Sequence, residues 1–345
     1  MTADPKKDFI KPLNEALVEM KHLCLENLRG RPVPLFAVYD ADGWHWWMPT
    51  PDGRIAHLRP IDTAEGKYLA EAPADPNDLY FPFLDFFVQR LPSNDLVHWL
   101  DAIVDDLWCL STSMAKLEFF YRSSLADKHL DFSWMVGTEI EYIVSVLRNV
   151  YDLLQEVIVL VWKSIQLHGC ERKNQELRKS FADMTMRADT LMSAADIASA
   201  RNVPDWLAAY YAACAPFFAD LRRYRNKFVH YGEKQGLLFV TDRGFAVDKH
   251  SEPFAGWDVW DADSISGNLA SLRPVFQHMM LSTFGAFTAF ASLMAEKIAF
   301  PLPVAPGYRM FIRGYHNGAL KRALSGAKWW DLDSSPPKDP EREPS

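Results

Sequence analysis

Apolar residues recur at helical spacing along most of the chain. One long stripe runs from Ser133 to Gly169, and another starts near Pro204 and stops at Gly232. Apolar residues three or four positions apart share one face of an α-helix, so the stripes predict long helices that pack together. We predict helices over residues 9–28, from the Ser93 cap through 110 and beyond, 133–169, 172–200, 204–232 and 266–298.

Short β-prone runs separated by Asp-Gly pairs interrupt this helical pattern near the N-terminus. The runs are 35–39, 44–48 and 54–58, and they predict a small three-stranded meander that contains Trp44, Trp46 and Trp47. Asp-Gly between β-prone runs is typical of a tight hairpin. A second hairpin is predicted over 237–248, around Asp242-Arg243-Gly244.

These elements predict a mainly α protein: a helical bundle with a β-hairpin insertion and a small N-terminal α/β appendage. We expect an appendage over 1–75, a helical connector over 76–130, the bundle over 131–300, and an extension with a disordered tail over 301–345.

Charge and cysteine content limit the kinds of binding site that the chain can contain. The formal net charge is −8, so any nucleic-acid site must be a confined basic patch. The four cysteines lie far apart and show no metal-ligand spacing, which favours free thiols in a reducing cytoplasm. The N-terminus lacks an apolar signal region, and the apolar run 279–295 is too short to span a membrane, so we expect no membrane association.

The C-terminal end of the helix predicted over 204–232 holds the densest positive charge. Its cations are Arg222, Arg223, Arg225 and Lys227. On a helix Arg222, Asn226 and His230 form one row at spacings of four, on the side away from the apolar stripe, with Arg225 on the flank. The stripe itself is predicted to hold Trp206, Tyr210, Ala213, Phe217, Leu221, Tyr224 and Phe228.

This set of side chains fits RNA cleavage without a metal or cofactor. His230 suits acid and base catalysis, because the pKa of histidine lies near neutrality. Arg225 suits a phosphate through its planar fork of donors, and Asn226 orients either group without adding charge. Arg222, Arg223 and Lys227 are the candidate phosphate-binding cations. A symmetric homodimer would supply the second histidine across a composite cleft.

Arg225-Asn226 followed by His230 near the end of a bundle helix resembles the signature of the HEPN (higher eukaryotes and prokaryotes nucleotide-binding) superfamily. The resemblance covers about residues 131–298. It implies a dimeric helical bundle and, in many members, metal-independent endoribonuclease activity in toxin–antitoxin or antiviral defence systems, with an antitoxin or regulatory partner. Family toxins that act with a nucleotidyltransferase antitoxin carry a Tyr two residues after the His, whereas Tyr231 follows directly here and Gly232 holds that place. Tyr231 and Glu139 are accessory candidates.

Arginine and histidine recur at similar spacing elsewhere in the chain, for example at Arg273 and His278. Arg225 differs because Asn226 follows it, two further arginines precede it, and the segment ends an amphipathic helix.

Two alternatives to a ribonuclease stay open. One is a catalytically silent HEPN module for dimerisation or partner binding, with the Trp-rich appendage as its recognition surface. The other is an unrelated helical protein in which the cations merely favour a helix C-terminus.

Overall fold

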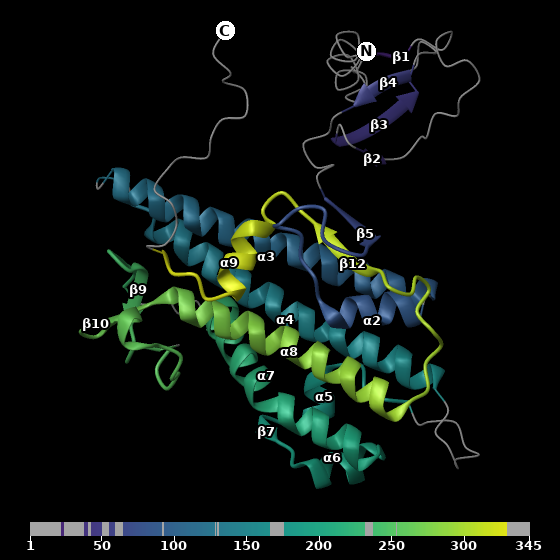
Figure 1. The fold of residues 1–345 in the computed structure, drawn as a ribbon. Coiled ribbons are helices and arrows are strands. Elements are labelled where there is room, and N and C mark those ends of the chain that lie inside the picture. Colours follow the sequence, from purple (N-terminus) through teal and green to yellow (C-terminus); the bar gives the residue numbers. More distant parts are fainter. Residues whose placement is uncertain are drawn as a thin grey trace, which may run out of the picture. The chain divides into compact units, whose positions relative to one another are not determined.

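The computed structural model describes two compact units, residues 1–66 and 67–345 (Figure 1). The described residues are 65–329 except 92, 128, 130, 166–175, 232–236 and 253, together with the strands within 22–58. The side chains of 228–231 are not described, and for the strands within 22–58 we describe the backbone. The predicted tail over 334–345 and most of the predicted helix over 9–28 lie outside these residues.

The N-terminal unit contains the predicted meander. Its strands are β1 (His22–Leu23), β2 (Val38–Asp40), β3 (Gly43–Pro49) and β4 (Ile55–Leu58), in the order β1-β4-β3-β2. All the pairings are antiparallel, and Tyr39 lies opposite Trp44. Strand β1 falls inside the helix predicted over 9–28, so that prediction was wrong for His22 and Leu23. Local periodicity does not reveal that the edge of β4 is open for pairing.

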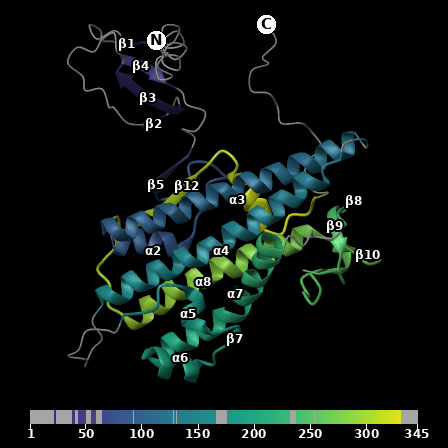
Figure 2. The ribbon, with the colours of Figure 1, turned by 180° about the vertical axis from the view of Figure 1, so that it is seen from behind.

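Four long helices form the body of the second unit: α3 (Asn94–Ala126), α4 (Ser133–Ser164), α7 (Asp205–Tyr231) and α8 (Leu272–Lys297). Helix α4 packs against the other three, as the opposite views in Figures 1 and 2 show. Its predicted stripe is buried, including Ile140, Leu147 and Leu154. The predicted cap of α3 is also present, since Ser93 Oγ accepts a hydrogen bond from the Leu96 amide at 3.3 Å. The mainly α fold class is therefore confirmed.

The predicted polar helix over 172–200 was wrong. Short elements occupy the described part of this segment: α5 (Phe181–Thr185), β6 (Met186–Arg187), β7 (Thr190–Leu191) and α6 (Ala194–Arg201). Two serine caps separate them. Ser180 Oγ accepts from the Asp183 amide, and Ser193 forms a reciprocal capping box with Asp196. Both Ser-x-x-Asp pairs are typical of helix N-termini. A prediction from the polar composition of the segment does not take them into account.

Helix α7 begins after Pro204, as predicted, but its core face is rotated from the predicted stripe. Ala213 is exposed, whereas Tyr211 and Phe218 are fully buried. The other deeply buried residues of α7 are Leu207, Ala208, Tyr210, Ala215, Leu221 and Tyr224. Both α4 and α8 pack on α7, and the sequence pattern alone does not predict which residues of α7 contact each of them.

A four-stranded antiparallel sheet joins α7 to α8. Its strands are β8 (Phe239–Thr241), β9 (Gly244–Asp248), β10 (Ile265–Ser266) and β11 (Leu269–Ser271), in the order β10-β11-β9-β8. The pairing of β8 with β9 corresponds to the hairpin predicted over 237–248. Because β10 and β11 use residues 265–271, the last long helix starts at Leu272, with Ser271 as its cap.

Among the described helices, α8 is the one that is long and apolar enough to cross a membrane by length and composition. Half of its most apolar window is buried inside the bundle, and Phe276, Met280 and Phe287 are fully or almost fully buried there. We therefore interpret α8 as the core helix that its sequence predicted.

The segments on either side of the bundle fold onto it. Helix α2 (Pro82–Arg90) packs on α8, and α9 (Asn317–Leu324) packs on α3 and α8. Strand β12 (Arg309–Arg313) pairs with β5 (Gly66–Ala70). The ranges 76–130 and 301–329 thus belong to the same compact unit as the bundle, and the unit boundary falls at residue 66 instead of the predicted 75.

Candidate functional site

The Arg-Asn-His segment, which runs from Arg225 to His230, lies in the last two turns of α7. The helix continues through Tyr231, so Arg222, Asn226 and His230 stand one turn apart along the same row. Leu221 and Tyr224, on the packed face of the same turns, are buried, while Arg225 and Asn226 are half-buried. The side chains of His230 and Tyr231 lie outside the described residues.

Each of the three predicted phosphate-binding cations has an acidic neighbour. Arg223 Nη2 lies 2.9 Å from Asp220 Oδ1, and Lys227 Nζ donates to Glu252 Oε2 at 2.9 Å. Arg222 Nη2 lies 4.0 Å from Asp189 Oδ1, whose side chain is 97% exposed. Ion pairs of this solvent-exposed kind contribute about 0–1 kcal/mol. A phosphate can therefore replace these carboxylates at small cost.

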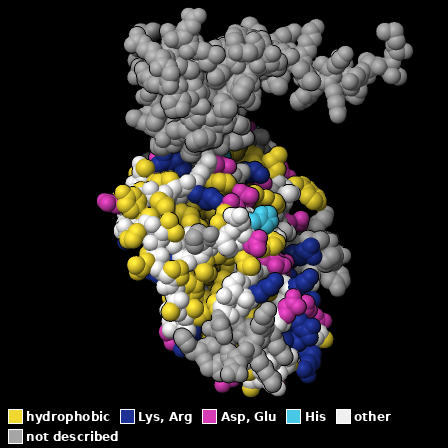
Figure 3. All heavy atoms as spheres, turned by 90° about the vertical axis from the view of Figure 1, so that its right-hand side faces the viewer, with side chains coloured by type: hydrophobic (Ala, Val, Ile, Leu, Met, Phe, Trp, Pro, Cys, Tyr) yellow, Lys and Arg dark blue, Asp and Glu magenta, His cyan; other side chains and the backbone are white. Residues whose placement is uncertain are grey.

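Positive charge on this acidic protein is unevenly distributed. Figure 3 shows one face, on which Lys and Arg side chains gather along the lower right side with acidic side chains between them.

Glu139, an accessory candidate, bonds to a lysine of the neighbouring helix α3. Glu139 is 8% exposed on α4, and its Oε1 accepts a hydrogen bond from Lys116 Nζ of α3 at 2.9 Å. The described contact of Glu139 thus joins α4 to α3. Its Oε2 is buried with no hydrogen-bond partner among the described residues.

Packing brings a second histidine beside the α7 cations. His278 of α8 lies between Phe217 and Trp257, with ring centroids 5.6 and 5.3 Å away. Partial burial lowers the pKa of His278, and the nearby carboxylate of Asp220 offsets part of this shift. Asp220 also pairs with Arg223, so imidazole, carboxylate and guanidinium groups share this face. Sequence reasoning missed His278, because its position follows from how α8 packs on α7.

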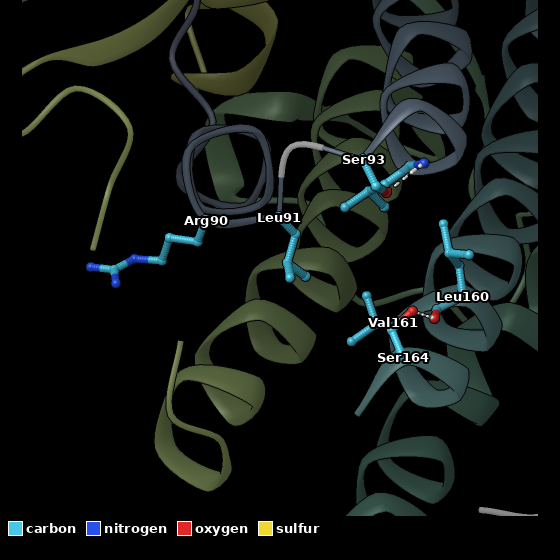
Figure 4. Close-up of a pocket in the computed structure, with 7 residues that line it drawn as sticks. Arg90, Leu91, Ser93, Leu160, Val161 and Ser164 are labelled. Carbon is cyan, nitrogen blue, oxygen red and sulfur yellow. Dashed lines mark hydrogen bonds between the residues drawn. The ribbon is translucent and has the colours of Figure 1, made fainter. Parts of the chain in front are cut away.

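A cavity among the described residues lies away from the Arg-Asn-His segment. It has a volume of about 270 Å³ and lies between the α2–α3 junction and the last turns of α4. Figure 4 shows Leu91, Leu160 and Val161 around it, with the guanidinium of Arg90 pointing away. Ser164 Oγ is occupied by a hydrogen bond to the Leu160 carbonyl at 2.8 Å. With these mostly apolar walls, the cavity offers no group for acid or base catalysis.

Metal-ligating side chains do not gather in the described part of the chain. No group of three or more His, Cys, Asp or Glu residues there is arranged to hold a metal ion. Cys109 and Cys214 are free, half-buried thiols. Burial raises the pKa of Cys214 to about 11, so this thiol stays protonated at neutral pH.

Comparison with known proteins adds no further constraint. No known family model, curated protein or solved structure matches this chain.

Proposed function

We propose that the chain is a metal-independent endoribonuclease of HEPN type, with an active site shared between two copies in a homodimer. The observation that carries the proposal is the continuity of α7 through Tyr231, which aligns Asn226 and His230 with Arg222 on one row. The proposed catalytic residues are Arg225, Asn226 and His230, beside the half-buried or exposed cations Arg222, Arg223 and Lys227.

Cleavage of RNA by this set needs a base for the 2′-hydroxyl and an acid for the leaving 5′-oxygen. One His230 accepts the first proton, and His230 of the second copy donates the other. Arg225 holds the negative charge that grows on the pentacoordinate phosphate, through two parallel N–H donors. Asn226 orients the phosphate or an imidazole. By resemblance, the proposed role is that of a cytoplasmic toxin or phage-defence effector under control of an antitoxin or regulatory partner.

The test is cleavage of single-stranded RNA by the purified full chain in EDTA. His230→Ala and Arg225→Ala should each lower the cleavage rate by about 10²-fold or more, since each removes an acid–base or charge-stabilising group. Arg309→Ala is the matched control, because Arg309 lies on β12 over the ring of Tyr80 and should leave the rate unchanged. Equal rates in the wild type and in both α7 variants would exclude the site.

One observation favours the second candidate, a catalytically silent HEPN module for dimerisation or partner binding. Large apolar side chains are exposed near the α3–α4 connection, where Phe119 is 64%, Trp134 71% and Met135 53% exposed. Exposed apolar groups of this size are common at protein interfaces. This candidate predicts a dimer that Phe119→Asp and Trp134→Asp weaken, and no RNA cleavage under any condition.

A further inference from the structure

The β6–β7 hairpin lies beside α7 and is flanked by two arginines with weak partners. Arg222 Nη1 approaches the sulfur of Met186 at 3.4 Å, and Arg201 Nη2 approaches that of Met192 at 3.6 Å. A thioether sulfur is a poor hydrogen-bond acceptor. Both guanidinium groups therefore keep most of their capacity to bind an anion.

Further arginines surround Arg201. Arg187 lies on β6 and Arg178 just before α5, and both are exposed. Burial is the largest cause that lowers the pKa of Arg201, and the charges of Arg178 and Arg187 lower it further. Like charges this close oppose folding unless solvent or a bound anion screens them.

Three aspartates nearby offset part of this positive charge. Asp183 raises the pKa of Arg201, but only as the smallest of the causes. Asp189 is 97% exposed and 4.0 Å from Arg222. The carboxylate of Asp196 accepts hydrogen bonds from the backbone and hydroxyl of Ser193, and the charge of Arg187 contributes to lowering its pKa. We define Arg178, Arg187, Arg201 and Arg222 as the hairpin arginine cluster.

We propose that the hairpin arginine cluster is the docking surface for the phosphate backbone of single-stranded RNA, and that it leads the strand to the Arg-Asn-His segment. This inference rests on the proposed function. Arg222 joins the two parts, because it contacts Met186 of the hairpin and begins the row that continues to Asn226 and His230. That row is about 12 Å long at the helical rise per residue.

RNA fits this surface better than an acidic protein segment does. The cluster is built from arginines, whose planar donors match phosphate oxygens in pairs. It is also continuous with a row of groups that suit phosphate chemistry. An acidic peptide would need only the charge and would gain nothing from that continuity.

The experiment measures binding of a fluorescent, 2′-O-methylated oligonucleotide of about 20 residues, longer than a typical single-strand site and resistant to cleavage, by the full chain. Arg187→Gln with Arg201→Gln should weaken binding about tenfold and reduce the slope of log affinity against log salt by about 1.4, since each lost phosphate contact removes about 0.7. Arg178→Gln with Arg187→Gln should act in the same direction. This second pair changes exposed side chains alone, so it keeps the test valid if the half-buried Arg201 is needed for folding.

The matched control is Arg90→Gln with Arg309→Gln, which changes the net charge equally at α2 and β12 and should leave affinity and slope unchanged. Unchanged binding in both cluster variants would overturn the docking surface, even if the wild type cleaves RNA. Weaker binding in these variants would support it, even if the wild type cleaves nothing. Polyglutamate that binds more tightly than the oligonucleotide would also overturn the proposal.

Discussion

Glu118 should be one of the most sensitive positions for stability. It lies on α3 and is shared by two arginines: its Oε1 lies 3.3 Å from Arg273 Nη2 of α8, and its Oε2 lies 2.5 Å from Arg322 Nη2 of α9. The side chains of Glu118 and Arg273 are 4% and 3% exposed. Burial lowers the pKa of Arg273, and Glu118 opposes that shift. This carboxylate thus neutralises a buried cation and connects three helices.

Glu118→Gln keeps the size of the side chain and removes its charge. A buried cation left without its partner costs about 3–5 kcal/mol, which for a unit of this size lowers the melting temperature by roughly 10 °C. Glu252→Gln is the matched control. It removes the partner of Lys227 from an exposed ion pair, so the expected cost is below about 1 kcal/mol.

Urea unfolding followed by circular dichroism measures both variants against the wild type. Glu118→Gln combined with Arg273→Met should lose less free energy of unfolding than the sum of the losses of the two single variants, because the double variant leaves neither of these two charges buried without its partner. A loss below about 1 kcal/mol for Glu118→Gln, equal to that of the Glu252 control, would refute this account of the buried charges.

Two further predictions concern backbone strain and pH. Gly244 has φ +99°, and an added Cβ would lie 2.0 Å from Trp329 Cδ1, whereas Gly256 has φ +90° with open space around it. Gly244→Ala should therefore lower the urea midpoint clearly more than Gly256→Ala, and equal midpoints would exclude the contact with Trp329 as the cause. Burial lowers the pKa of His278 and His316, so just below about pH 6.5 the unfolded chain binds more protons and stability falls on acidification. Replacing both histidines with Gln should reduce the fall in melting temperature between pH 8 and pH 5, and an unchanged fall would contradict these pKa shifts.

Long periodic segments carried most of the fold information in the sequence. The stripe from Ile140 to Val161 predicted α4, and the serine before Asn94 predicted the start of α3. Short elements were harder, because α5 and α6 are defined by the caps at Ser180 and Ser193, and a composition-based reading merges them into one helix. Strand β1 was missed because pairing with a distant strand determines it.

The candidate site also has features that the sequence predicts and features that depend on packing between distant segments. The row of Arg222, Asn226 and His230 follows from helical spacing within one segment, so it was predictable from the sequence. The approach of His278 to Asp220, and of Arg201 to Arg187, depends on the packing of separate elements. No local pattern encodes such proximity. The sequence therefore indicated the positive charge at the end of α7, and did not indicate the arginines that packing brings near it.

We propose a ribonuclease site that needs His230 from both copies of a dimer. The most direct measurement is the rate of RNA cleavage in EDTA after wild-type protein has exchanged subunits with a ninefold excess of His230→Ala, with exchange checked by native mass spectrometry. If both histidines are required, activity per wild-type chain falls roughly tenfold, because about one wild-type chain in ten then has a wild-type partner. Absence of cleavage by the wild type, or unchanged activity per wild-type chain after exchange, would contradict the claim.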